Sequence, residues 1–161
     1  MRTLRTAARL LVVAPDGAVF LFRYDDDEIG LHWTTPGGGL EAGETPREGA
    51  VRELREETGW SDLEPGPLLC TWVHDYTRAG VPVRQHEHIF LARGPRRELS
   101  GDLAAMHTAD RILRWRWWMP QELADFPELL LPPQLPALVT AVLREAPAAP
   151  APIDLGYVPL R

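Results

Sequence analysis

The feature that most constrains this chain is a glycine-rich loop that leads directly into a strongly specified helix. Residues 36–44 are PGGGLEAGE, and the helix signals follow at once. Thr45 is a favourable N-cap, Pro46 suits the first helical position, and Glu48 completes a capping box with Thr45. Gly59 provides a natural C-terminal stop. The pattern therefore predicts a helix that begins at Pro46 and ends just before Gly59.

Three glutamates gather near the end of this predicted helix, in the stretch RELREETGW. At about 100° per residue, Glu53, Glu56 and Glu57 fall within an arc of roughly 100°. Each such like-charge pair costs roughly 0.2–0.5 kcal/mol, and acids in a last turn oppose the helix dipole. A placement that breaks local rules points to a functional site, and carboxylates are ligands that Mg²⁺ prefers. The alternative is a solvated acidic face paired with neighbouring arginines.

These acids belong to a longer pattern. From Gly38, five residues lead to Glu44, seven more lead to Arg52, and then comes Glu53-Leu54-x-Glu56-Glu57-x-Gly59-Trp60. This pattern closely resembles the signature of the Nudix hydrolases, which usually have an aliphatic residue where this chain has Trp60. Because Trp keeps bulk and hydrophobicity, we expect the packing of helix and loop to be retained. The wider order of elements over residues 5–145 is similar as well.

The resemblance implies a fold, a reaction and a set of site residues. The implied fold is an α/β/α sandwich with a central mixed sheet. The implied reaction is hydrolysis of a diphosphate linkage in a nucleoside diphosphate derivative, with Mg²⁺ or Mn²⁺ as cofactor. The family pattern implies that Glu53, Glu56 and Glu57 are metal ligands and that Arg52 orients them. It also implies that Glu44 supports the loop or lies near the metals, and that Gly38 and Gly39 let the backbone approach the diphosphate.

The chemistry of a diphosphate agrees with this set. Its dense negative charge repels a hydroxide nucleophile, and divalent metals offset that charge and lower the pKa of a bound water. A carboxylate must accept the proton of that water. Glu57 is the first candidate within the motif, and Glu87, in RQHEHIF, is the second, as a base or an added metal ligand. The alternative for Glu87 is an exposed polar position on a strand, and His107 has no support from the sequence.

Substrate recognition is less constrained. Trp33 is a candidate for stacking on a nucleobase, with a core position as the alternative. Tyr76 lies sixteen residues past Trp60, an offset that resembles one used by dinucleoside polyphosphate hydrolases of the family. A dinucleoside polyphosphate and a modified nucleotide both remain open as substrates.

Two alternative functions use the same fold. A nucleotide-sensing module would bind without cleaving, but such modules often lose acids of the motif, and all of them are present here. Isoprenyl diphosphate isomerisation needs a catalytic cysteine in a different place. Cys70, the single cysteine, lies in the apolar run LLCTWV, where we expect a buried core position.

Composition limits the partners. With 161 residues the chain fits one domain with a buried core. The net charge of −6 gives no basic footprint for a nucleic acid polymer, and no apolar run approaches the roughly 18–20 residues that span a membrane. We therefore expect a cytoplasmic protein, and the resemblance implies a small nucleotide-type substrate. The resemblance is also compatible with a homodimer.

The remaining patterns outline one domain and a tail. Residues 7–14 and 18–24, joined by Pro-Asp-Gly, predict a hairpin. Further strands are predicted at 68–76, 83–92 and 113–119, a loop at 93–112, and an apolar-faced helix at 134–145. The hydrolase domain is expected over residues 1–145, followed by a Pro/Ala-rich tail over 146–161.

Overall fold

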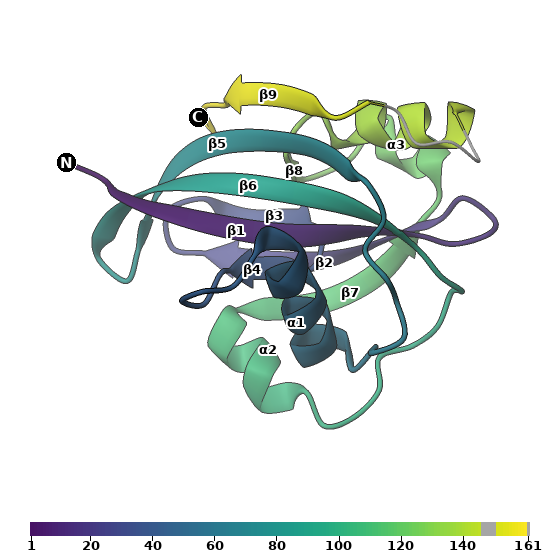
Figure 1. Cartoon of the computed structure of the whole chain (residues 1–161), viewed down its shortest axis with the longest axis horizontal. Coiled ribbons are helices and arrows are strands. Elements are labelled where there is room, and N and C mark those ends of the chain that lie inside the picture. The colour runs from purple at the N-terminus through teal and green to yellow at the C-terminus, as the bar shows by residue number, and fades with distance from the viewer. Residues whose placement is uncertain (146–150, 161) are drawn as a thin grey trace.

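The computed structural model describes residues 1–145 and 151–160. A single curled mixed sheet carries helices on its two faces (Figure 1). The strands are β1 (Thr3–Val13), β2 (Val19–Asp26), β3 (Gly30–Thr34), β4 (Gly37–Gly39), β5 (Leu68–Arg78), β6 (Val81–Arg93), β7 (Ile112–Trp118), β8 (Leu129–Leu131) and β9 (Ile153–Tyr157). The helices are α1 (Pro46–Thr58), α2 (Ala104–Asp110), α3 (Leu135–Arg144) and the short 3₁₀ helix η1 (Pro120–Leu123).

The sheet runs in the order β8-β3-β2-β1-β6-β5-β9, with β4 also paired to β1 and β7 to β2. Strands β1 and β6 are parallel along their whole length, while β5 and β6 form an antiparallel hairpin. The predicted hairpin of β1 and β2 is confirmed, with Val13 opposite Val19. The predicted mixed sheet is therefore confirmed.

Strand β1 is apolar on both sides because the sheet is covered on both sides. Leu10 and Val12 point into the cluster that packs against Leu54 of α1. Leu11 and Val13 point into the opposite cluster, which holds the buried face of α3: Leu135, Leu138, Val139 and Val142. The two cores explain the continuous apolar run in the sequence and confirm the expected layers of helix, sheet and helix.

Helix α1 has the bounds that the sequence predicts. The Oγ1 of Thr45 accepts a hydrogen bond from the N–H of Glu48, and the carboxylate of Glu48 accepts one from the N–H of Thr45. The helix ends at Gly59, whose φ of 81° lies in the left-handed region that favours glycine. Both ends of the helix are thus fixed by local sequence.

Two segments differ from the sequence interpretation. The prediction of a loop throughout 93–112 is wrong, because α2 lies within it. None of the residues of α2 is buried, so no apolar periodicity marks this helix. In addition, β9 comes from the segment assigned to the tail and pairs in parallel with β5. Residues 146–150 of that predicted tail lie outside the described residues.

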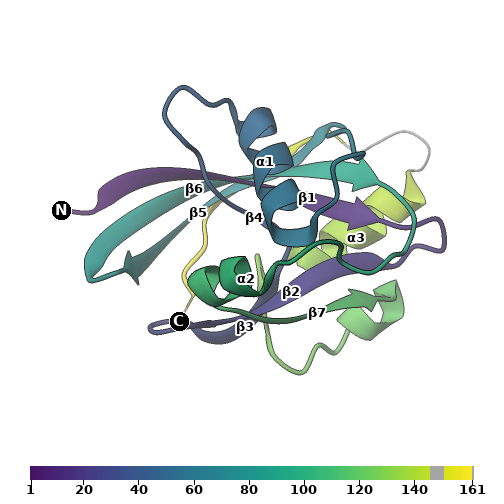
Figure 2. The ribbon, with the colours of Figure 1, turned by 90° about the horizontal axis from the view of Figure 1, so that it is seen from below.

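Within the described ranges, no helix combines the length and the apolar character needed to cross a bilayer. Figure 2 shows α1 on one face of the sheet and α3 behind it, with α2 next to the end of α1. This arrangement brings the glycine-rich strand β4, the acidic face of α1 and the end of α2 together.

Candidate metal and diphosphate site

Three carboxylates from two helices converge beside the glycine-rich strand. Oxygen atoms of Glu53, Glu57 and Asp110 all lie within 4.8 Å of one another. Glu53 and Glu57 come from α1, while Asp110 is the last residue of α2. Glu57 is buried, Glu53 is half-buried and Asp110 is exposed. We call these three residues the carboxylate cluster.

The electrostatics of the carboxylate cluster are unfavourable without a cation. Burial raises the pKa of Glu57 well above its usual range, and the negative charge of Glu53 raises it further. Burial likewise raises the pKa of Glu53 and of Asp110. Three acidic oxygens at this spacing suit a hard divalent cation that prefers oxygen ligands. The donor set therefore fits a metal site.

The glycines of β4 allow the close approach that brings the carboxylate cluster to the backbone. Gly37 donates its N–H to Glu57 Oε1 at 2.9 Å. At Gly38 a β-carbon would come within 2.8 Å of Glu53 Oε1, and at Gly39 it would overlap the guanidinium of Arg5. The two consecutive glycines thus place a cluster carboxylate and a guanidinium side by side.

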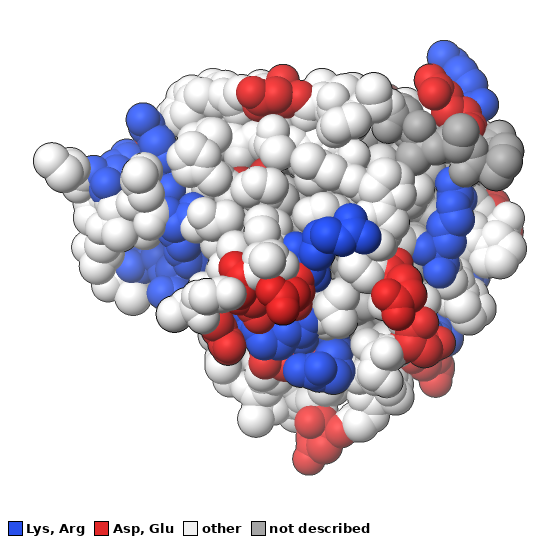
Figure 3. All heavy atoms as spheres, viewed as in Figure 1, with Lys and Arg blue, Asp and Glu red and all other residues white. Residues whose placement is uncertain are grey.

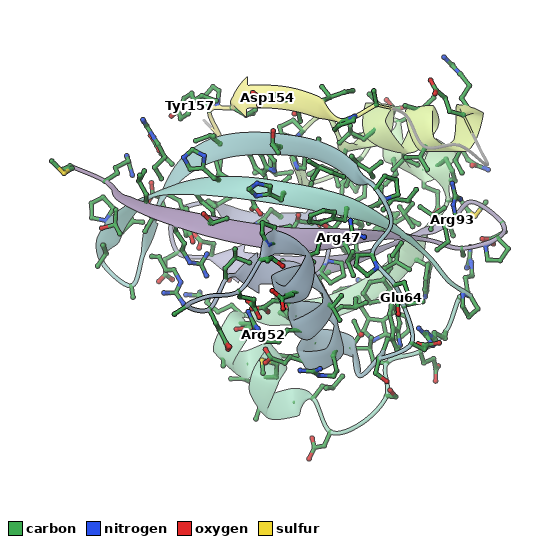
Figure 4. The ribbon with its side chains drawn as sticks, in the orientation of Figure 1. Arg47, Arg52, Glu64, Arg93, Asp154 and Tyr157 are labelled. Carbon is green, nitrogen blue, oxygen red and sulfur yellow. The ribbon has the colours of Figure 1, made fainter. Side chains whose placement is uncertain are left out.

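Arg52 joins the loop to the acidic face of α1, and Figure 4 shows its side chain beside this helix. Its guanidinium donates to Glu44 at 2.7 Å, to Glu53 at 3.1 Å and to Glu56 at 3.2 Å. It also donates to the carbonyl of Gly39 at 3.0 Å. The hydrogen bonds from Arg52 lower the pKa of Glu44 to about 2. Arg52 therefore bridges the glycine-rich loop and the acidic face of α1.

The structure separates the predicted ligands into two groups. Glu53 and Glu57 lie in the carboxylate cluster, whereas Glu56 is partly exposed and paired with Arg52. Glu44 bonds Arg52 and the N–H of Glu41, so it supports the loop. Asp110 completes the cluster, and the sequence contained no signal for it.

The cluster lines one side of an open cleft of about 810 Å³. The opposite wall is polar and comes from β1, β5 and β6. Its side chains are Arg5, Arg9, His74, Tyr76, Gln85 and Glu87. The Tyr76 hydroxyl donates to Gln85 Oε1 at 3.0 Å, and the Tyr76 ring stacks on His74 with centroids 5.4 Å apart. Tyr76 thus lines the cleft, and Gln85 and His74 hold its ring in place.

Glu87 and Trp33 are not part of the carboxylate cluster. Glu87 accepts a hydrogen bond from Arg9 at 2.8 Å and lies 3.3 Å from His74 Nε2. Burial opposes ionisation of Glu87, but Arg9 and His74 outweigh it and hold its pKa well below the usual range. Trp33 is 3% exposed in the core, and its Nε1 donates to Glu128 at 2.9 Å. This core position is the alternative that the sequence left open for Trp33.

Comparisons with known proteins agree with this geometry. A model of the NUDIX domain matches residues 3–141. An RNA pyrophosphohydrolase of Erythrobacter litoralis is 35% identical over 139 residues, which cover 80% of this chain and 82% of that protein. Among solved structures, the MutT protein of Methanosarcina mazei has a TM-score of 0.66 at 17% identity, covering 91% of this chain and 98% of its own. A C. elegans Ap4A hydrolase has a TM-score of 0.59 at 20% identity, covering 87% and 98%.

Proposed function

This chain belongs to the Nudix hydrolase family, and we propose that it cleaves a diphosphate bond of a nucleotide derivative in the cleft beside Glu53, Glu57 and Asp110. The observation that carries the proposal is the convergence of these three carboxylates next to the glycine strand β4. Such a site places acidic oxygens for a cation beside the guanidinium of Arg5, and a phosphate chain needs both a cation and a positive charge. The name of the relative from Erythrobacter litoralis, RNA pyrophosphohydrolase, agrees with this proposal.

The cation that we propose for the carboxylate cluster is Mg²⁺ or Mn²⁺. When bound, a divalent cation offsets phosphate charge and lowers the pKa of a water molecule. Glu53, Glu57 and Asp110 would hold it, and Arg52 would keep Glu53 in place. The raised pKa values of all three acids support this assignment, since a cation would stabilise their ionised forms.

Two arginines are suited to bind phosphate oxygens. Arg5 lies against Gly39, and its hydrogen-bond partners are the neutral groups of Tyr76 and Gln85. Arg5 and Arg78 both favour the ionised form of Asp110, so their charges reach the cluster. Within residues 1–145 and 151–160, neither arginine has a carboxylate within ion-pair distance. Figure 3 shows basic side chains gathered where β1 begins, close to a group of acids.

Proton transfer is the remaining requirement. We propose that Glu57 accepts the proton of the attacking water. Its Oε1 is fixed by the N–H of Gly37, and it offers a carboxylate oxygen to the cluster. Glu87 is less suited to this role, because Arg9 and His74 stabilise its ionised form and lower its affinity for a proton. Glu87 instead supports the cleft wall.

The substrate that we propose is a nucleoside carrying a chain of phosphates. The relatives are named for RNA and for Ap4A, and both compounds present such a chain to an enzyme. The net charge of −6 argues against wide contact with a nucleic acid polymer, but cleavage at a phosphorylated end needs only the end of the strand. Such substrates and Mg²⁺ occur together in the cytoplasm, where we place the activity.

A substrate screen with metal titration tests the proposal. The panel contains oxidised nucleotides, dinucleoside polyphosphates, ADP-ribose, nucleotide sugars and 5′-triphosphorylated RNA. We expect Mg²⁺-dependent turnover of at least one compound and a loss of at least about 100-fold in Glu53→Gln and Glu57→Gln. Glu64→Gln is the matched control, because Glu64 is exposed and belongs neither to the carboxylate cluster nor to the residues that line the cleft. Undiminished turnover in both cluster variants would overturn the site.

The rival function is a sensing module that binds nucleotides without cleaving them. Tight binding of a panel compound by the metal-loaded protein, with no product after prolonged incubation, would favour it. The complete set of motif acids argues for cleavage, since a purely binding module has no need to keep carboxylates under mutual repulsion.

A further inference from the structure

The connection between β6 and β7 is fastened to the end of α1 through carbonyls that the helix itself leaves free. The last carbonyls of an α-helix have no partner within the helix. Ser100 donates its N–H to the carbonyl of Thr58 at 2.9 Å, and Nε2 of His107 lies 2.7 Å from the carbonyl oxygen of Glu57. Because a carbonyl only accepts, that nitrogen carries a hydrogen and donates it. Both bonds end on the turn that carries Glu57.

The same segment delivers the third carboxylate of the cluster. Asp110 ends α2 and lies three residues after His107, so the two residues share one side of the helix. The helix has seven residues, none of them buried. A helix of this length is not stable by itself. Its position beside the end of α1, visible in Figures 1 and 2, therefore depends on the few contacts that it makes.

His107 makes the contact that faces the body of the protein. Its ring meets Phe22 edge-on, with centroids 5.5 Å apart, while Nε2 bonds α1. The neighbouring Thr108 is exposed, and its hydroxyl bonds the carbonyl of Ala104 within the same helix. His107 thus links α2 to both β2 and α1.

Gly59 makes this close docking feasible. Beyond its left-handed φ of 81°, a β-carbon at this position would overlap the carbonyl oxygen of Ser100. A side chain there would push the connection away from the end of α1. Gly59 therefore has two roles: it ends α1, and it provides the space in which the segment that carries Asp110 packs against this helix.

We propose that His107 is a positioning residue that holds Asp110 against Glu53 and Glu57, and that it thereby sets the affinity of the carboxylate cluster for a divalent cation. The inference rests on the proposed function, since it takes this cluster to be the cation site. Groups that orient metal ligands typically change metal affinity about 10- to 100-fold. His107 acts through Asp110 and does not itself contribute a ligand atom to the cluster.

Binding of Mn²⁺, followed by electron paramagnetic resonance in the absence of substrate, tests the proposal. His107→Phe keeps a ring against Phe22 and removes the donor, whereas His107→Gln keeps an N–H donor and loses the ring. We expect His107→Phe to raise the Kd for Mn²⁺ by about 10-fold or more, and His107→Gln to recover most of the affinity. Thr108→Ala, an exposed change on the same helix, should leave the Kd unchanged.

A double-mutant cycle with Asp110→Asn separates positioning from general destabilisation. If His107 acts through Asp110, Asp110→Asn by itself lowers the affinity for Mn²⁺, and adding His107→Phe to it lowers that affinity little further. Fully additive losses, or an unchanged Kd in His107→Phe, would overturn the inference while leaving the cluster as the cation site. If Glu57→Gln binds Mn²⁺ as the wild type does, the proposed function fails as well.

Discussion

The carboxylate of Glu53 lies directly over Gly38, so that a β-carbon on Gly38 would come within 2.8 Å of Glu53 Oε1. Gly38→Ala therefore forces either the strand or the carboxylate to move. We expect this variant to fold and to lose about 10-fold or more in kcat/KM, since small displacements in a site reduce catalysis strongly. Thr140→Ala is the control, because Thr140 is exposed on α3, the helix that packs on the opposite face of the sheet. Steady-state kinetics of both variants measure this difference, and an unchanged kcat/KM in Gly38→Ala would contradict the prediction.

Arg52 fixes the geometry of several acceptors at once, and a lysine cannot reproduce this. Its guanidinium bonds Glu44, Glu53, Glu56 and the carbonyl of Gly39. We expect Arg52→Lys to retain the positive charge but to lose the forked geometry, which raises the metal concentration needed for half-maximal activity by about 10-fold. A normal metal requirement in this variant would contradict the orienting role.

Glu57 gives the metal-free protein a definite pH dependence. Its folded-state pKa is raised, so it binds a proton more tightly when folded than when unfolded. Its contribution to stability is complete below the unfolded pKa and is lost as the pH rises through the folded pKa. Without metal, Glu57→Gln should therefore be more stable than the wild type near pH 7–8, and the difference should grow by up to roughly 1.4 kcal/mol for each pH unit above the unfolded pKa.

Thermal unfolding of both proteins in a chelator, between pH 4 and pH 8, measures this difference. The two curves should approach each other toward pH 4, and saturating Mg²⁺ should stabilise the wild type more than the variant. A wild type that remains the more stable protein at pH 8 in chelator would contradict the assignment of a repelled, buried carboxylate at this position.

Arg5 is predicted to act on substrate affinity. It faces Gly39 and bonds only neutral side chains among the described residues, so its charge remains available to phosphate. Arg5→Gln should raise KM by about 10-fold, which is the order expected for one lost charge-assisted hydrogen bond, while kcat changes much less. Arg55→Gln, on the exposed side of α1, serves as the matched control. Equal KM values for wild type and Arg5→Gln would remove Arg5 from the phosphate site.

The last described strand is predicted to stabilise the domain. Val158, the residue directly after β9, is 8% exposed and donates its N–H to the carbonyl of Val73 at 2.8 Å, while Ile153, the first residue of β9, is 44% exposed. Val158→Asp buries an unpaired charge and should lower the free energy of unfolding by about 2–4 kcal/mol. Ile153→Asp should change it by less than about 1 kcal/mol. Urea denaturation of both variants measures the contrast.

The sequence predicted those parts that depend on local chemistry. The capping box, the stop at Gly59 and the apolar runs of β1 and β2 each contain their own signal, and the structure has the corresponding elements. The motif spacing likewise pointed to Glu53 and Glu57, because residues four apart on a helix share a face. Their proximity required no knowledge of the rest of the chain.

The residues that the sequence did not indicate depend on contacts between distant segments. Asp110 ends a helix without an apolar face, and its distance from Glu57 is set by the docking of α2. Arg5 and Arg9 lie far from β6 in the sequence, and the pairing of β1 with β6 brings them to the same cleft as Gln85 and Glu87. Strand β9 follows a Pro/Ala-rich segment whose composition favours a tail. Each of these positions follows from tertiary structure.

The parallel pairing of β9 with β5 has a consequence for synthesis of the protein. Strand β5 is made early, yet the strand that covers its outer edge is encoded some 80 residues later, at Ile153–Tyr157 against Leu68–Arg78. While the chain emerges from the ribosome, that edge presents unpaired backbone groups to neighbouring chains. A nascent chain that stalls after α3 therefore exposes the unpaired edge of β5. Holdase chaperones that bind extended apolar segments can bind this edge until β9 has been synthesised.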